Sequence, residues 1–596
     1  MGYQWLYTTY NGGGGLRKTK IVCTLGPASD DLVTVKALIE RGMNVARLNF
    51  SHGSHEEHRR RIELVRAASA ELGCEVGVML DTRGPEIRTG SLKNGAVELR
   101  AGDAFTLTSR SVEGNEQEVQ VSYAELPHYV EPGERIMIAD GLLSLLVTRT
   151  TDTDIICEVV TGGMLGERKG INVPGVKTNL PFLNSKDVDD ISFGIHNGID
   201  FVAASFVRTA EDVLEIRKII EEKGASVDII AKIESQEAVN NLDEIIRAAD
   251  GVMVARGDLG VEIPTEEVPL VQKSIIQKCR LRGKPVIIAT QMLESMVSNS
   301  RPTRAEASDI ANAIFDGTDA VMLSGETAAG TYPLEAVETM GRIAQRAEEA
   351  LPYEKVLSDK VHVGNLTVTD AISHATCSAA LDLGASALIT ATKSGHTARM
   401  VAKYRPRAPI IAATPLLEVV RKLTLVWGVQ AIMVNETSSL DEMLKEAVKG
   451  ALARQAIVSG DLVVVTAGTP GVPGTTNLLR VLVVGDVVAR GTGIGHRPVT
   501  GRARIVLRPE QVQDFSPGDI LITIQTDRDF VELFKQAGAV VTEQGGLTSN
   551  AAIVGISLNI PVVVGVPDAT RVIREGELIT VDTARGQIYR GEIKVL

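Results

Sequence analysis

The sequence predicts an α/β protein built around a (β/α)8 barrel. Short apolar, β-branched stretches alternate with amphipathic helical ones, which indicates parallel strands covered on both faces. Eight such strand-and-helix units follow one another, and eight is the number that closes a barrel of this type. Polar residues gather where the strands end. The predicted strands span residues 21–25, 45–50, 77–81, 200–206, 228–233, 251–255, 285–290 and 320–324.

The ends of these strands carry nearly all the polar residues of the predicted barrel. In a barrel the carboxyl ends of the strands meet at one face, and catalytic residues lie on that face. Charges that served only folding would be scattered between strand starts and strand ends. The residues at or just past the ends are Arg47, Asn49, Asp81, Lys232, Glu234, Asp258, Thr290, Ser324 and Glu326.

Length and changes of pattern divide the chain into six segments. With 596 residues it is too long for one hydrophobic core. Residues 82–199 are too many for one crossover helix, and their short alternating strands predict a small β domain, hinged near Gly84 and Pro181, that serves as a lid. The predicted segments are a disordered leader 1–16, barrel 17–84, β lid 85–182, barrel 183–350, an open α/β domain 351–484 and an extra C-terminal domain 485–596 rich in Gly and Val.

The composition excludes several classes of protein. A formal net charge of -13 argues against a nucleic-acid-binding protein. No apolar stretch is long enough to cross a bilayer, and the N-terminus lacks the pattern of a signal peptide. The 5 cysteines are scattered without a C-x-x-C pair, as expected for buried free thiols in a reducing compartment. We therefore expect a cytoplasmic protein without nucleic-acid or membrane partners.

Two carboxylates and one lysine on neighbouring strands indicate a divalent metal site. Lys232 and Glu234 point to the same side because side chains alternate along a strand. Asp258 leaves the next strand in a Gly-rich turn. Such a sparse pair suits Mg2+, and Lys232 can neutralise an enolate or a phosphoryl group in transfer. The alternatives are solvated loop charges and a structural salt bridge between Lys232 and Glu234.

A second group of oxygen ligands lies on the second and third strands. Asn49, Ser51, Asp81 and Thr82 can form an all-oxygen site with one negative charge. That charge fits a large monovalent ion such as K+ better than a second Mg2+. Ordinary capping of strand ends by Asn, Ser, Asp and Thr explains these residues equally well.

A short polar loop in the third domain has the pattern of an anion site. It follows a predicted strand and precedes a helix expected near 398–404, so N–H groups, hydroxyls and the positive end of the helix dipole face one point. The loop at 466–477 can close over the same anion. The loop residues are Thr392, Lys393, Ser394, Gly395, His396 and Thr397.

These motifs together closely resemble pyruvate kinase. The likeness spans about residues 17–482. It implies that phosphoenolpyruvate and ADP give ATP and pyruvate, in glycolysis, with Mg2+ or Mn2+ and K+ as cofactors and in a homotetramer. The matching segments are KTKIVCTLGPAS (18–29), NVARLNFSHG (44–53), DTRGPEIRTG (81–90), AKIE (231–234), MVARGDLGVE (253–262), ATQMLE (289–294) and MLSGETA (322–328).

The resemblance assigns roles in the reaction by position. Arg47 would hold the substrate phosphate, and Lys232 would stabilise the transferring phosphoryl group and the enolate. The backbone of Gly257 and Asp258, with Thr290, would hold the substrate carboxylate. Thr290, Ser324 and Glu326 would lie near the water path that protonates the enolate.

The resemblance also assigns the ions and the nucleotide. Glu234 and Asp258 would bind Mg2+, and Glu86 predicts dependence on K+ because Lys at that position replaces the ion in this family. The K+ ligands would be Asn49, Ser51, Asp81 and Thr82. The nucleotide would contact Asn49, Ser51, His52, Arg88 and Lys169.

Two departures from the family pattern concern regulation and the C-terminal domain. The anion loop matches the family's allosteric phosphate site, but its usual basic residue is here His396, so the effector can be ribose 5-phosphate or AMP rather than fructose 1,6-bisphosphate. Residues 485–596 resemble the swivelling phosphohistidine domain of phosphoenolpyruvate-utilising enzymes. The phosphoryl-accepting position is Asn550, and an amide is a poor acceptor, so we expect a structural or interface role.

Three other functions compete with this interpretation. A Mg2+-dependent aldolase or lyase acting on pyruvate would use the same barrel and metal pair, but it leaves the lid and the α/β domain without a role. A phosphotransferase relay of the phosphoenolpyruvate synthase type would need a phosphoryl acceptor at Asn550. A catalytically inactive regulatory protein is disfavoured because every candidate catalytic residue is present.

Overall fold

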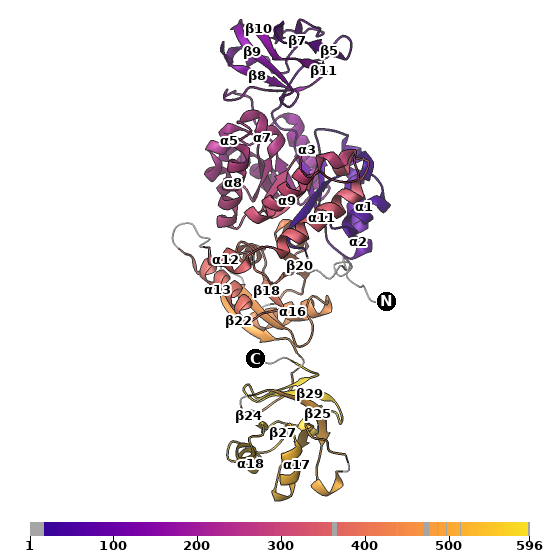
Figure 1. Ribbon diagram of the computed structural model, residues 1–596, viewed down its shortest axis with the longest axis vertical. Coiled ribbons are helices and arrows are strands. Elements are labelled where there is room, and N and C mark those ends of the chain that lie inside the picture. Colours follow the sequence, from indigo (N-terminus) through magenta and orange to yellow (C-terminus); the bar gives the residue numbers. More distant parts are fainter. Residues whose placement is uncertain are drawn as a thin grey trace. The chain divides into compact units, whose positions relative to one another are not determined.

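The computed structural model describes residues 17–359, 366–437, 439–468, 476–485, 487–495, 497–512 and 514–593 (Figure 1). The predicted leader 1–16 and residues 469–475 of the predicted closing loop lie outside these ranges. The chain forms two compact units. The first is Met1–His374, Thr392–Glu436 and Gly471–Thr476, and the second is Ala375–Ala391, Thr437–Pro470 and Asn477–Leu596. The boundaries of the six predicted segments stay predictions.

Eight parallel strands close into a barrel in the first unit, which confirms the predicted fold class. Their order around the barrel is β1-β17-β16-β15-β14-β13-β3-β2. Strand ends differ from the prediction by at most two residues. The strands are β1 (Lys20–Thr24), β2 (Val45–Asn49), β3 (Gly77–Asp81), β13 (Phe201–Ala204), β14 (Asp228–Ile233), β15 (Gly251–Ala255), β16 (Val286–Ala289) and β17 (Ala320–Leu323).

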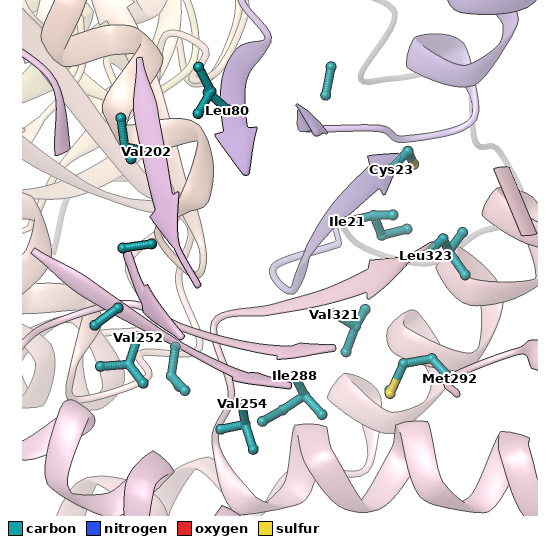
Figure 2. Packing of buried hydrophobic residues seen from close by; sticks show 14 of the residues in the cluster. Ile21, Cys23, Leu80, Val202, Val252, Val254, Ile288, Met292, Val321 and Leu323 are labelled. Carbon is teal, nitrogen blue, oxygen red and sulfur yellow. The ribbon is translucent and has the colours of Figure 1, made fainter. Parts of the chain in front are cut away.

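Apolar side chains fill both faces of the barrel strands because neighbouring residues point to opposite sides. Ile21 and Cys23 belong to the layer between strands and helices, whereas Val22 belongs to the interior of the barrel. Figure 2 shows Val252 and Val321 in the outer layer. The helices of this part are α1 (Leu32–Glu40), α2 (His55–Leu72), α3 (Ser185–His196), α4 (Ala210–Glu222), α5 (Gln236–Asn240), α6 (Leu242–Ala248), α7 (Arg256–Glu262), α8 (Val268–Arg282), α9 (Arg304–Asp316), α10 (Gly325–Ala328) and α11 (Pro333–Glu349).

The segment between β3 and α3 folds as the expected β domain with its own hydrophobic core (violet in Figure 1). One sheet has the order β4-β12-β8-β9-β10-β6-β7, and a second pairs β11 with β5. Its elements are β4 (Ile87–Arg88), β5 (Ala96–Leu99), β6 (Ala104–Thr108), β7 (Glu118–Gln120), β8 (Arg135–Ile138), β9 (Leu143–Thr150), β10 (Asp154–Thr161), β11 (Gly163–Gly166), β12 (Gly170–Asn172) and the short 3-10 helix η3 (Leu126–His128).

Parallel strands and helices alternate after the barrel, as an open α/β domain requires. In the first unit β19 (Ile410–Thr414) pairs with β20 (Val429–Met433), and in the second unit β18 (Ala387–Ala391) pairs with β21 (Leu462–Gly468); both pairs are parallel. The helices of this region are α12 (Tyr353–Ser358), α13 (Val368–Asp382), α14 (His396–Ala402), α15 (Leu417–Lys422) and α16 (Leu440–Ala453).

The C-terminal part of the second unit follows β22 (Thr476–Val483) and contains an eight-stranded mixed sheet of order β23-β30-β29-β25-β26-β27-β28-β24 (Figure 1). Its elements are β23 (Val487–Arg490), β24 (Thr492–Ile494), β25 (Val499–Ile505), β26 (Ile520–Thr523), β27 (Ala539–Thr542), β28 (Val562–Val564), β29 (Leu578–Asp582), β30 (Gln587–Arg590), α17 (Val531–Gln536), α18 (Asn550–Leu558) and α19 (Ala569–Val572).

All five cysteines are buried free thiols, as predicted. Within the described ranges, no helix combines the length and the apolar character needed to cross a membrane.

Candidate active site at the barrel mouth

Lys232 forms the centre of a buried charge cluster at the C-terminal ends of the barrel strands. It lies on β14 and is 8% exposed. Its Nζ is 2.9 Å from Glu234 Oε1 and 3.2 Å from Asp81 Oδ1, and it donates to Ser205 Oγ at 2.7 Å. Burial opposes the charge, but Asp81 and Glu234 outweigh it and raise the pKa of Lys232. Lys232 is therefore a fixed ammonium group.

Arg47 and Asp81 join this cluster from β2 and β3. Arg47 Nε donates to Asp81 Oδ2 at 2.6 Å, and its Nη1 donates to Thr24 Oγ1 at 2.9 Å. Burial opposes ionisation of Asp81, but Arg47 and Lys232 hold its pKa below the usual range. One buried carboxylate thus fixes two cations from different strands. The prediction from the strand ends is confirmed for these residues.

Glu234 and Asp258 form a crowded pair of carboxyl groups. Burial raises the pKa of Glu234 to about 7, against the effect of Lys232, and the Asp258 charge adds to the rise. Burial also raises the pKa of Asp258, which hydrogen bonds to Glu234. Asp258 lies in the first turn of α7 rather than in the predicted Gly-rich turn. The residues after β15 continue directly as a helix, so that part of the prediction was wrong.

The same two carboxyl groups fit a divalent metal ion. Glu234 Oε2 accepts from Phe206 N at 2.6 Å, but Glu234 Oε1 is buried and forms no well-aligned hydrogen bond. Burial disfavours the ionised forms of both carboxyl groups, and a hard cation bound to their oxygens would stabilise those forms. Among the described residues, no group of three or more His, Cys, Asp or Glu side chains could hold a metal. A two-carboxylate site leaves coordination positions for water and substrate.

Thr290 is held in an unusual backbone conformation next to Gly257. Its φ is 67°, which is strained for a β-branched residue, and strain of this kind concentrates at functional sites. Its Oγ1 accepts from Gly257 N at 2.8 Å and donates to Ala289 O at 2.6 Å. Arg256 Nη2 donates to Thr290 O at 2.8 Å and so supports the strained turn. The structure therefore brings Thr290 and Gly257 together, as predicted.

Glu326 lies at the end of the last barrel strand. It is 1% exposed, and its carboxylate accepts from Leu293 N at 3.1 Å and from Ser324 N at 2.6 Å. Burial raises its pKa despite these bonds. The protonated form of Glu326 is therefore more accessible than that of an exposed glutamate.

The four predicted K+ ligands lie at adjoining strand ends. Asn49 and Asp81 are register partners on β2 and β3. Asn49 Oδ1 accepts from Ser51 N at 3.1 Å, and Thr82 Oγ1 accepts from Ser205 N at 3.1 Å. The donor set has one carboxylate, already balanced by cations, and otherwise neutral oxygens. It fits a weakly charged ion, and the assignment of K+ stays a prediction.

The predicted nucleotide contacts come from two parts of the first unit. Arg88 lies on β4 and is the register partner of Gly170 on β12, which directly follows Lys169. Arg88 is 2.6 Å from Glu86 Oε2. His52 lies in the loop before α2.

A cavity of about 190 Å³ opens beside Asp258, between the β domain and the barrel. Glu86 and Asp140 line it from the β domain, and both raise the pKa of Asp258 through their charge. Asp140 was not singled out from the sequence, and its φ of 56° in the Ala-Asp-Gly turn is the signal that only the backbone provides. Ser205 was also missed, although it follows a barrel strand.

The predicted anion loop precedes α14, which begins at His396, two residues before the predicted start. Thr392 Oγ1 accepts from Gly395 N at 3.0 Å, and Gly395 has a φ of 79°. Thr397 Oγ1 lies 2.9 Å from Thr476 Oγ1. Lys393 is paired with Glu436 at 2.8 Å. The assignment of this loop as an effector site stays a prediction.

Asn550 is the first residue of α18, and Ser549 caps that helix through a bond to Ala552 N. Its Oδ1 accepts from Thr526 Oγ1 at 3.4 Å. The Asn550 side chain is therefore hydrogen-bonded within its own domain.

Comparison with known proteins gives matches along nearly the whole chain. Residues 16–337 match the family model "Pyruvate kinase, barrel domain", residues 370–482 match "Pyruvate kinase, alpha/beta domain", and residues 515–586 match "PEP-utilising enzyme, mobile domain". The chain is 53% identical to the pyruvate kinase of Bacillus licheniformis over 98% of its length and 100% of the relative. It is 53% identical to that of Geobacillus stearothermophilus over 97% of its length and 100% of the relative. The crystal structure of a pyruvate kinase from Cryptosporidium parvum matches with a TM-score of 0.74 and 42% identity, covering 78% of this chain and 96% of that one.

Proposed function

We propose, from the premise that the chain belongs to the pyruvate kinase family, a role for each group at the barrel mouth in that family's reaction. The enzyme transfers the phosphoryl group of phosphoenolpyruvate to ADP and yields ATP and pyruvate, and it requires metal ions. The observation that carries the assignment is the position of Lys232 Nζ between Asp81 and Glu234.

Arg47 and Lys232 bind and stabilise the transferred phosphoryl group. The phosphoryl group carries negative charge throughout its transfer, so fixed positive charges lower the barrier without having to reorganise. Asp81 keeps both cations in place because it accepts bonds from each of them. The same ammonium group of Lys232 stabilises the enolate that remains after transfer.

Glu234 and Asp258 hold Mg2+ or Mn2+. The bound ion supplies a Lewis acid and a template for substrate oxygens. The raised pKa values of the two carboxyl groups support this assignment, because a cation would favour the ionised forms that burial disfavours.

Thr290 and the backbone around Gly257 bind the substrate carboxylate. Thr290 Oγ1 already accepts from Gly257 N, and a carboxylate can take over that N–H. We assign the protonation of the enolate carbon to a water path near Thr290, Ser324 and Glu326. Glu326, with its raised pKa, is a reservoir for that proton.

Asn49, Ser51, Asp81 and Thr82 bind K+, and Asn49, Ser51, His52, Arg88 and Lys169 contact the nucleotide. Glu86 supports the K+ assignment, because this position lacks the lysine that substitutes for the ion in other members of the family. The test is a steady-state assay with phosphoenolpyruvate and ADP in matched K+ and Na+ buffers. Activity should collapse in Na+ alone; equal activity in both buffers would refute the K+ site.

Residues 392–397 bind a phosphorylated effector in a homotetramer. Ribose 5-phosphate, AMP and fructose 1,6-bisphosphate should be compared in the same assay. His396 stands where the family has its usual basic residue, and because burial lowers the pKa of His396, the site favours the first two. If the Ser394→Asp variant responds to all three effectors as wild type does, the proposed effector site is wrong.

A further inference from the structure

Helix α3 is the first element after the β domain, and its first turn contacts the point where the chain leaves the barrel for that domain. Asp187 is fully buried, with 0% exposure. Its Oδ1 accepts from Gly84 N at 3.3 Å, and its Oδ2 accepts from Asn184 Nδ2 at 2.6 Å. Gly84 has a φ of 73°, and a Cβ there would lie 2.9 Å from Ser205 O. The backbone at Gly84, where the chain enters the β domain, therefore has little freedom, and Asp187, where the chain returns to the barrel, hydrogen bonds to it.

Lys186, in the same first turn of α3, and Asp190, in the next turn, contact the loop after β2 and the start of α2. Lys186 Nζ donates to Phe50 O at 3.0 Å and to Asp190 Oδ2 at 2.5 Å. Phe50 stands between Asn49 and Ser51. Asp190 Oδ1 lies 2.6 Å from His55 Nε2, at the start of α2. Thus α3 holds both ends of the loop formed by residues 50–54.

Ring contacts reinforce the same junction. His55 stacks on Phe193 of α3 with ring centroids 4.2 Å apart, and Phe50 stacks on His58 at 3.9 Å. The Asp190 side chain is 1% exposed, and burying a charge of this kind brings little net stability. A buried, multiply bonded carboxylate instead fixes the geometry of the groups around it. The junction has the properties of a positioning device.

We propose that Lys186, Asp187 and Asp190 are positioning residues that couple the hinge of the β domain at Gly84 to the loop 50–54. Through this junction, ordering of the loop by nucleotide and monovalent ion restrains the hinge, and movement of the hinge displaces the loop. The proposal rests on the proposed roles of Asn49 and Ser51. It adds a mechanical link between the two ligand contacts and the lid.

The test uses Lys186→Met, with Lys186→Arg as the conservative variant and Lys218→Met as the matched control. Lys218 is an exposed lysine on the next helix and pairs only at 3.9 Å with Glu222. Loss of the two charge-assisted bonds of Lys186, to Phe50 O and to Asp190, should raise the KM for ADP and the half-saturating K+ concentration roughly tenfold. The KM for phosphoenolpyruvate and the kcat at saturating K+ should stay within about twofold, and Lys186→Arg should restore most of the loss.

Hydrogen exchange of full-length enzyme provides the second measurement. In wild type, saturating ADP and K+ should protect peptides around Gly84; in Lys186→Met this protection should be lost at the same ligand concentrations. Unchanged ADP and K+ constants in Lys186→Met would overturn the proposal, as would an equal loss in all four kinetic constants. Lys186→Met is expected to fold, because the Lys186 side chain is 49% exposed, so these measurements decide the outcome. A wild-type enzyme indifferent to K+ would instead refute the proposed K+ site.

Discussion

Lys232→Met separates the catalytic role of the central ammonium group from its structural role. Methionine keeps much of the side-chain length and removes only the charge and its hydrogen bonds. The substitution leaves Asp81 paired with Arg47, but it leaves Glu234 without its cation. Activity and stability should therefore respond by different amounts.

The expected loss of activity is large. Removing one preorganised group that stabilises a transition state costs about 10²–10³ in kcat, and a full buried charge belongs at the upper end. A thousandfold loss corresponds to about 4 kcal/mol. The KM for phosphoenolpyruvate should change much less, because the proposed ground-state contacts of Arg47 and Thr290 are retained.

The expected loss of stability is smaller, because Glu234 can take up a proton. Leaving a buried carboxylate unpaired would cost about 3–5 kcal/mol. The pKa of Glu234 is already about 7, and without Lys232 it should rise further. A carboxyl group with a raised pKa binds its proton in the folded state, so stability falls as the pH rises from its unfolded pKa, near 4.5, toward the folded one. The variant should approach wild-type stability at pH 5 and lose stability through neutral pH.

Two assays decide the outcome. Pyruvate release in a coupled assay gives kcat, and thermal unfolding followed by circular dichroism between pH 5 and 8.5 gives stability. Lys218→Met is the control for loss of a lysine elsewhere. A kcat within tenfold of wild type would refute the role of Lys232, and a stability difference that does not vary with pH would refute the account of Glu234.

Three further predictions concern other parts of the chain. Burial lowers the pKa of Lys20 from 10.5 to about 7, so the wild-type protein should become more stable as the pH rises from 7 to 10.5, by up to about 1.4 kcal/mol per pH unit. Lys20→Met should lack this gain. Melting temperatures that change in parallel with pH in both proteins would contradict the prediction. Arg399 on α14 is 2.6 Å from Asp228, the first residue of β14, so Arg399→Met should weaken effector activation several-fold at nearly unchanged basal kcat; full activation in this variant would disprove the connection. Incubation with phosphoenolpyruvate should leave no covalent phosphate on Asn550, as peptide mass spectrometry can check; a phosphorylated peptide would count against a non-catalytic domain.

The barrel and most of its mouth could be predicted because strand periodicity and strand ends are local properties of a sequence. Asp81 and Lys232 followed directly from that rule. Ser205 obeys the same rule but stands in an apolar stretch, where a single hydroxyl gives a weak signal. The helix α7 could not be predicted, because Gly257 and Gly260 disfavour helix and the tertiary structure overrides that preference.

Other features depend on contacts between distant residues. The left-handed conformation of Thr290 is supported by Arg256, which is 34 residues away, and no local sequence pattern predicts this conformation. The bond from Lys186 to Phe50 joins residues 136 apart. A single sequence gives no measure of such pairs, so the junction between α3 and the loop 50–54 is visible only in the structure.

The charge balance of the mouth gives the proposed metal ions a role in substrate binding as well as in chemistry. Arg47 and Lys232 contribute two positive charges, whereas Asp81, Glu234 and Asp258 contribute three negative ones when ionised. With both substrates anionic and a chain charge of -13, the protein alone would repel what it must bind. The negative charge of Asp81 must remain, because its carboxylate orients both Arg47 and Lys232. One divalent ion at the proposed site on Glu234 and Asp258 would reverse the sign of the charge at the mouth, and the proposed monovalent ion beside Asp81 would add to it. Substrate affinity should therefore depend on both ions before any catalytic step begins.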